Sequence, residues 1–139
     1  MEFILLPLIA WCTAGFIKVI LYYARVHQFK PMEFFRYGGF PSAHTSLVAS
    51  AVFFAGLREG FYTPVFSIGL ALLLVVITDA HGLRRYVGRQ AEAVNQLREK
   101  NGDTRAKLLK EQVGHSWWEI IGGLFTGILT ALFIHWLTR

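Results

Sequence analysis

The sequence has few charged residues and almost no cysteine. Asp, Glu, Lys and Arg make up 17% of its 139 residues, whereas 54% are hydrophobic and 15% are aromatic. This composition is too apolar for an average soluble domain. The single cysteine, Cys12, excludes an intramolecular disulfide and a cysteine-based metal site. Internal repeats and low-complexity tracts are also absent. The apolar residues come in blocks and the length leaves no room for a second domain, so the sequence indicates one membrane-embedded domain over residues 1–139.

The hydrophobic residues are gathered into four blocks. These blocks cover about Phe3–Tyr23, Ser42–Leu57, Pro64–Thr78 and Trp117–Leu137. A helix needs about 20 apolar residues to cross a hydrocarbon core of ~30 Å, so the second and third blocks are short and their ends are expected to face a cavity. The first block is too long for a signal-peptide core and no small-residue cleavage site follows it, so it is expected to stay in the mature protein. We therefore predict an all-α bundle of four transmembrane helices.

The long polar segment His81–Ser116 separates the third and fourth blocks. Apolar residues recur there at spacings of three and four, which predicts an amphipathic helix of about four turns. These residues are Val87, Ala91, Val94 and Leu97. The turn signal Asn101-Gly102-Asp103 ends this helix, and a second short helix is expected over about Thr104 to Gln112. The segment is thus predicted to form an amphipathic helical hairpin on the membrane surface.

Basic residues are concentrated in two of the expected loops. With four spans, the loops 24–41 and 81–116 lie on the same side and hold eleven Lys and Arg, whereas the other side has Arg58 and Arg139. The positive-inside tendency predicts that the first side is cytoplasmic and both termini are outside, as in a bacterial-type inner or plasma membrane. The formal net charge of +5 then reflects topology and anionic headgroups of the bilayer, and nucleic-acid binding is not expected.

Polar residues gather at the predicted cytoplasmic end of the first two spans. Lys18 and Arg25 are seven residues apart, so they share one helix face. The glycine-rich stretch 38–46 brings Ser42 and His44 to the start of the second span. A helix N-terminus there can bind an anion, although Pro-Ser before an apolar run is also typical of a helix cap.

The last two spans bring further polar residues to the same end. Asp79, His81, Arg84 and Arg85 follow the third block. His115 and Glu119 open the fourth block and are four residues apart, so they are neighbours on one helix face. Each of these side chains alone is also compatible with an ordinary interfacial residue, such as a histidine bonded to backbone or a snorkelling lysine. Their convergence favours a functional site.

This set of side chains is suited to phosphoryl transfer. A histidine can attack phosphorus directly, and a carboxylate on its other ring nitrogen fixes the tautomer that attacks. A second histidine can protonate the leaving alcohol. Arginine and lysine side chains can hold the phosphoryl oxygens, where catalysis depends mainly on positioning and charge stabilisation.

The same residues resemble the type 2 phosphatidic acid phosphatase superfamily, which includes the vanadium haloperoxidases. Its motifs K-x6-R-P, P-S-G-H and S-R-x5-H-x3-D have counterparts at Lys18-x6-Arg25, 41–44 and His115-x3-Glu119. The chain is most similar to a small divergent branch, described as acid phosphatase and haloperoxidase related. That branch has G-G-M-P-S-[SA]-H, D-A-x-G-V-R-R, G-x-Q-A and L-K-E-x-x-G-H, which correspond in order to 38–44, 79–85, 88–91 and 109–115.

The resemblance implies a role for each matched residue. His115 would be the nucleophile that forms a phosphohistidine, Glu119 would orient it in place of the superfamily's aspartate, and His44 would be the general acid. The phosphate-binding residues would be Lys18, Arg25 and Ser42. The superfamily is generally metal-independent, so the resemblance implies no metal and no other cofactor.

Two positions depart from the superfamily pattern more strongly. Val26 replaces the proline of the first motif, and Leu109 stands where the third motif has an oxygen-binding arginine. Arg84 and Arg85 belong to the divergent branch's own signature and could supply that guanidinium from another loop. Arg85 is the favoured replacement and Lys110 is the fallback.

These observations predict a membrane lipid-phosphate phosphatase that acts on phosphatidylglycerophosphate or phosphatidic acid at the cytoplasmic interface. The alternatives are a polyprenyl pyrophosphate phosphatase, a phosphotransferase, and a non-catalytic phospholipid-binding protein that lost turnover through Leu109. Asp79 has no counterpart in the three motifs and is expected to clamp an arginine rather than to ligate a metal. A homodimer is expected, packed through Gly122, Gly123 and Gly127, because small residues let helices approach closely.

Overall fold

The structure is a computed structural model that describes residues 2–35, 38–102 and 107–139. In these ranges every regular element is helical, as the sequence predicts. The elements are α1 (Glu2–Val26), the 3-10 helix η1 (Pro31–Phe35), α2 (Ala43–Glu59), α3 (Pro64–Thr78), the π-helical turn η2 (Asp79–Leu83), α4 (Arg84–Lys100) and α5 (Trp117–Leu137).

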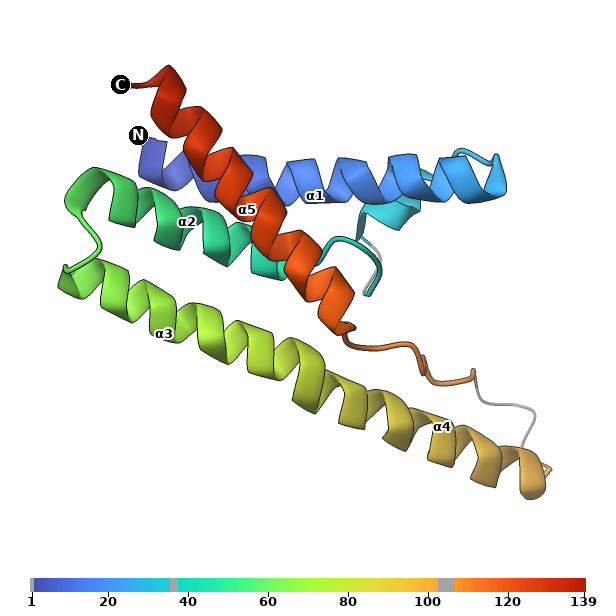
Figure 1. The fold of residues 1–139 in the computed structure, drawn as a ribbon. Helices are drawn as coiled ribbons and strands as arrows, with labels where there is room; N and C mark the ends of the chain where they lie inside the picture. The colour runs from blue at the N-terminus through green and yellow to red at the C-terminus, as the bar shows by residue number, and fades with distance from the viewer. Residues whose placement is uncertain (1, 36–37, 103–106) are drawn as a thin grey trace.

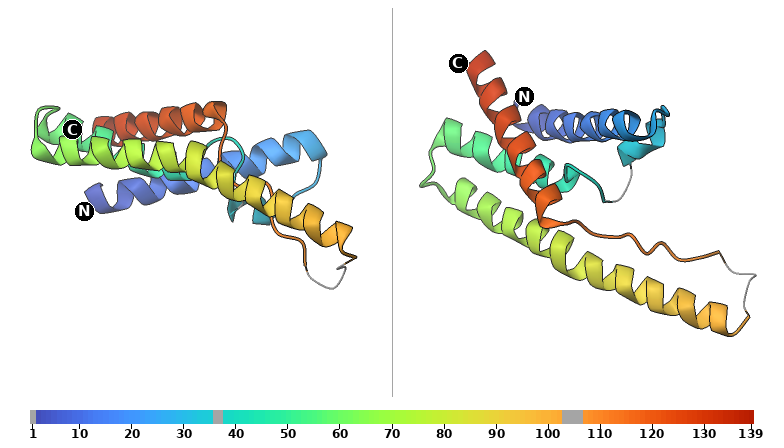
Figure 2. Two further views of the ribbon diagram at one scale, coloured as in Figure 1. Left: turned by 90° about the horizontal axis from the view of Figure 1, so that it is seen from below. Right: turned by 45° about the vertical axis from the view of Figure 1, so that its right-hand side comes forward.

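The helices α1, α2 and α3 alternate in direction, and α2 packs against α1, α3 and α5 (Figures 1 and 2). Both chain termini lie at the same end of the bundle as the turn between α2 and α3. Arg58 links the beginning of α1 to the end of α5. It forms an ion pair with Glu2 and donates a hydrogen bond to the Thr138 carbonyl oxygen at 3.1 Å. The loop before α2 and the segment before α5 lie at the other end, which the predicted topology also requires. The membrane side of each end stays a prediction.

Three helices of the described chain are long and apolar enough to cross a membrane: α1, α5, and α3 with its continuation to Lys100. The helix α2 has 17 residues and is largely enclosed by protein, with the polar side chains of Thr45, Ser46 and Ser50 fully buried. Small and polar residues of this kind are typical of contacts between membrane helices. The chain is therefore an all-α membrane protein, and the count of four spans stays a prediction.

Glycines of α5 let this helix approach α2 closely. A Cβ atom at Gly123 would lie 2.5 Å from the Ser42 carbonyl oxygen, and one at Gly127 would lie 2.5 Å from the Ser46 carbonyl oxygen. A Cβ atom at Gly122 would collide with an aromatic ring of the loop before α2. The expectation that these three glycines pack a homodimer is thus wrong, because their surface is covered within one chain. The homodimer itself stays a prediction.

The backbone stays helical from Pro64 to Lys100, so α3 and α4 form one long helix (Figure 1). The apolar block ends at Thr78 as predicted, but the chain does not turn away there. Instead it passes through the π-helical turn, in which the Arg84 N–H donates to the Asp79 carbonyl oxygen five residues earlier. Such π-turns inside longer helices frequently occur at functional sites.

Residues 107–116 contain no helix, so the second helix predicted over about Thr104 to Gln112 is wrong for 107–112. Residues 104–106 lie outside the described ranges. The segment runs back beside α4 (Figures 1 and 2). Contacts with Asn95 explain why it does not form a helix. The Asn95 side chain accepts from the Leu109 N–H and donates to the Leu109 carbonyl oxygen, both at 2.9 Å. Tertiary bonds therefore satisfy backbone groups that a helix would have paired internally.

The helix α4 ends at Lys100, directly before the predicted turn. Of the four apolar residues that predicted an amphipathic helix, three are exposed on the protein: Val87, Val94 and Leu97. The buried residues are Gly88, Ala91 and Asn95. A Cβ atom at Gly88 would collide with the Glu111 carbonyl oxygen, so glycine allows the returning segment to lie directly on α4.

Candidate active site

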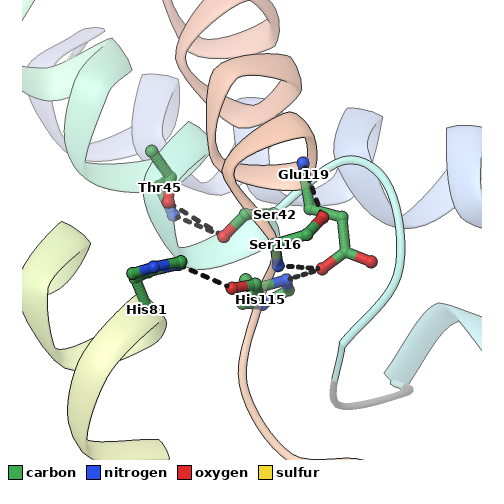
Figure 3. A network of polar contacts seen from close by, with 6 residues as sticks. All are labelled: Ser42, Thr45, His81, His115, Ser116 and Glu119. Carbon is green, nitrogen blue, oxygen red and sulfur yellow. Dashed lines mark hydrogen bonds and ion pairs between the residues drawn. The ribbon is translucent and has the colours of Figure 1, made fainter. Parts of the chain in front are cut away.

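His115 lies just before α5 and is buried, with 4% of its surface exposed. Gly114 precedes it with φ of +100°, a conformation that favours glycine, and a Cβ atom there would lie 2.8 Å from Cγ of Arg85. The His115 N–H donates to the Ala80 carbonyl oxygen at 2.9 Å. The His115 carbonyl oxygen lies 3.3 Å from Nδ1 of His81 (Figure 3). The π-helical turn thus holds the backbone of His115 at two points.

Glu119 binds the imidazole of His115 and the start of α5 at the same time (Figure 3). Its Oε2 lies 2.9 Å from Nδ1 of His115 and accepts the Ser116 N–H at 3.0 Å. The Ser116 hydroxyl accepts the Glu119 N–H in return, which completes a capping box. Because a carboxylate accepts hydrogen bonds, Nδ1 carries the proton and Nε2 keeps the lone pair. The predicted pair at positions i and i+4 is therefore a direct contact.

The pKa of His115 is lowered from its ordinary value, mainly because the ring is buried. The hydrogen bond and negative charge of Glu119 raise the pKa, and the positive charges of Lys18 and Arg84 lower it further. The net direction keeps the imidazole neutral at pH 7. Neutral imidazole is the form in which Nε2 can act as a nucleophile.

A cavity of about 250 Å³ is lined by His115, His44 and Lys18. His44 is the second residue of α2, and Lys18 lies on α1 with 8% of its surface exposed. Three side chains that are far apart in the sequence thus share one cavity, as their positions at one end of the predicted spans suggested. The rest of its wall is largely aromatic and was not anticipated from the sequence.

A larger cavity of about 700 Å³ is also lined by His115. Arg25, Arg85 and Glu119 belong to its wall, so the favoured arginine shares a cavity with the histidine. Arg84 is not among the lining residues of either cavity. Its Nε instead lies 2.6 Å from Oδ2 of Asp79. Asp79 thus holds an arginine, as predicted from the sequence.

Residues 1–130 of the chain match the Divergent PAP2 family. The protein belongs to the Divergent PAP2 family. The chain is similar in sequence to the "Uncharacterized membrane protein YuiD" of Bacillus subtilis (strain 168). It is 31% identical over 109 residues, which cover 68% of this chain and 69% of the relative. The membrane relative and the three apolar helices together support an integral membrane location. No solved structure matches the chain.

The structure explains how a Divergent PAP2 chain can carry leucine at position 109. Leu109 is bonded to Asn95, which is ten residues beyond Arg85 on α4, or about 15 Å along the helix axis. Gly114, next to His115, lies against Arg85. Position 109 is therefore remote from the histidine. Lys110, the fallback, lines a separate hollow beside Asn95 together with Leu109.

Ser42 lies at the predicted place but is fully buried. Its hydroxyl oxygen accepts from the Thr45 N–H at 3.4 Å and from the Thr45 hydroxyl at 2.9 Å (Figure 3). Ser42 thus caps α2, and neither cavity at His115 includes it among its lining residues. The sequence allowed two roles for this serine, a helix cap and phosphate binding. In the structure Ser42 is the helix cap.

Replacing Glu119 by Gln is expected to lower the pKa of His115 further. The amide oxygen can still accept the Ser116 N–H, so the cap stays, but the negative charge that opposes the effect of burial is lost. Histidine NMR titration of protein labelled at the imidazole nitrogens in detergent would measure the change. Glu92→Gln, on the exposed side of α4, is the matched control and should leave the titration unchanged. An unchanged or raised pKa in Glu119→Gln would contradict the electrostatic role.

Proposed function

We propose that the protein is a membrane phosphatase that hydrolyses a lipid phosphomonoester through a phosphohistidine intermediate. The observation that carries the proposal is the position of His115. Its Nδ1 is held by Glu119, and its ring lines both a cavity with His44 and Lys18 and a cavity with basic residues. Membership of the Divergent PAP2 family supports a phosphatase-related role.

In the first step, Nε2 of His115 attacks phosphorus and the bond between phosphorus and the ester oxygen breaks. The leaving alcohol takes its proton from His44, which lines the same cavity and has to carry a proton in the complex with the anionic substrate. The ammonium group of Lys18 stabilises the charge on the phosphoryl oxygens, and Arg25 and Arg85 attract the anion from the larger cavity.

In the second step, a water molecule attacks the phosphohistidine and gives a proton to His44. The bond between phosphorus and nitrogen breaks, which releases inorganic phosphate and restores neutral His115. Glu119 stabilises the ring while it bears the phosphoryl group, because its carboxylate accepts the Nδ1 proton. Atoms and charges balance with water as the second substrate.

The substrate we favour is phosphatidylglycerophosphate or phosphatidic acid, as the predicted cytoplasmic position of the site suggests. Loss of turnover through Leu109 has less support, because that position lies about 15 Å along α4 from the contact between Arg85 and Gly114. A polyprenyl pyrophosphate remains the alternative substrate. A homodimer stays part of the proposal, with a surface other than the α5 glycines.

The test is phosphate release by detergent-purified protein from phosphatidic acid, phosphatidylglycerophosphate and polyprenyl pyrophosphate, with and without a chelator. We expect release from one of the two phosphomonoesters, unaffected by the chelator. Preference for the pyrophosphate would move the substrate class to the alternative. Release that requires added metal would contradict the metal-free mechanism. Absence of release from all three lipids would overturn the enzyme assignment in favour of a binding protein.

A further inference from the structure

Three side chains on α1 form a line that leads from its apolar interior to the candidate active site. Trp11, Lys18 and Arg25 are spaced by seven residues, so they share one helix face at steps of about 10 Å. Trp11 and Lys18 line the 250 Å³ cavity at His115. Lys18 and Arg25 line a third cavity of about 100 Å³, and Arg25 also lines the larger cavity. The face thus changes from aromatic to cationic toward the end of α1.

The deep part of this line belongs to an aromatic wall. Trp11 packs edge to face on Phe34 with ring centroids 5.0 Å apart, and its centroid lies 6.0 Å from that of Phe35. A Cβ atom at Gly15, one turn beyond Trp11, would collide with the Phe34 ring, so glycine lets η1 pack on α1. All three rings line the 250 Å³ cavity. Such a wall favours hydrocarbon, because aromatic faces offer few hydrogen bonds to a polar group.

The orientation of His115 relates the phosphoryl group to this wall. Glu119 lines the larger cavity and holds Nδ1 of the ring. Nδ1 and Nε2 leave the imidazole ring at a wide angle, so Nε2 is directed away from Glu119. The smaller cavity is lined by His115 together with His44 and Lys18, and Glu119 is not among its lining residues. A phosphoryl group bound in this cavity therefore has its ester oxygen near His44 and the aromatic wall.

We propose that the cavity formed by Trp11, Phe34 and Phe35 binds the carbon atoms directly next to the ester oxygen of the lipid phosphate, which favours phosphatidic acid, whose glycerol has no free hydroxyl there, over phosphatidylglycerophosphate. The inference rests on the proposed function and adds that the enzyme selects its substrate by these carbon atoms. A volume of about 250 Å³ corresponds to roughly eight water-sized groups at ~30 Å³ each, enough for a phosphoryl group and the first few carbon atoms. Longer chains extend from this cavity into the bilayer.

Binding of alkyl phosphonates tests this subsite without turnover. Calorimetry would compare ethylphosphonate with hexylphosphonate, both water-soluble, on the full-length protein in detergent. We expect hexylphosphonate to bind wild type at least about tenfold more tightly, since each buried methylene contributes ~0.8 kcal/mol and four are added. Trp11→Ala should reduce that ratio at least about fivefold while ethylphosphonate binds as before.

Two further variants keep the test decisive. Phe35→Ala truncates a second ring of the wall, and its side chain is more exposed than that of Trp11, so this variant is expected to fold if Trp11→Ala does not. Trp136→Ala is the matched control, because this exposed tryptophan lies at the other end of the chain's last helix. An equal loss of chain preference in the control would overturn the subsite, as would an unchanged ratio in both Trp11→Ala and Phe35→Ala.

Phosphate release from ethyl phosphate and hexyl phosphate, measured in parallel, separates the two proposals. Chain-dependent phosphonate binding without phosphate release would support the subsite and contradict the phosphatase. Phosphate release from both esters with equal kcat/KM, together with equal phosphonate affinities, would support the phosphatase and overturn the subsite.

Discussion

Replacing His115 by Ala is expected to reduce phosphate release by about 10⁴-fold or more, the scale on which enzymes lose activity when a nucleophile is removed. The reason is that the phosphoryl group is transferred to Nε2 of this ring before water attacks. The second histidine cannot substitute for it, because His44 has to protonate the leaving alcohol from its own position on α2. The proteins would be incubated with substrate that is radiolabelled in its phosphoryl group and then quenched without acid. Wild-type protein should become labelled, and His115→Ala should not.

The matched control is His27→Asn. His27 is exposed just beyond the end of α1 and has φ of +55°, a conformation that asparagine tolerates. This variant should keep wild-type release and wild-type labelling. A His115→Ala protein that still releases phosphate at a comparable rate, or is labelled to the same extent, would show that another group carries the phosphoryl intermediate.

The sequence pattern alone located the parts of the site that depend on regular helix geometry. The spacing of four residues predicted that His115 and Glu119 are neighbours, and they are in contact. The spacing of seven placed Lys18 and Arg25 on one face, and both line a common cavity. Apolar blocks likewise predicted the positions of the long helices. In each case the interaction is local, or depends on which end of a helix a residue occupies.

The segment before α5 could not be predicted because its conformation depends on contacts with α4. Leucines and lysines at 107–110 suit a helix by propensity, yet Asn95 binds the backbone of Leu109 in a non-helical conformation. The signal that could have indicated this was the series Gly88, Ala91 and Asn95, in which small residues and one amide share a helix face. Such a face suits close contact with backbone more than contact with lipid.

The aromatic wall was missed for a related reason. A tryptophan in an apolar block is usually expected to face lipid or the interface, and Trp11 has no polar neighbour in the sequence to suggest otherwise. Its spacing of seven from Lys18 was available, as was Gly15 one turn away. What the sequence could not show is that η1 folds back so that Phe34 packs against Gly15.

The α5 glycines lead to the second large effect that we expect. Gly127→Val should destabilise the fold by about 3 kcal/mol, the upper part of the range for overpacked cores. A Cβ atom at this position would lie 2.5 Å from the Ser46 carbonyl oxygen and 2.8 Å from Cβ of Ala49, so α5 has to move away from α2. Backbone atoms cannot rotate aside as a flexible side chain can. Thermal unfolding in detergent, followed by loss of the monodisperse chromatographic peak, would measure the change.

Phe125→Val is the control on the same helix, because Phe125 is exposed while Gly127 faces α2. It should unfold near the wild-type temperature. Because the glycine face packs on α2, Gly127→Val should also reduce phosphate release, since α5 carries Glu119 and begins beside His115. A Gly127→Val protein that unfolds at the wild-type temperature would contradict the close contact between α5 and α2.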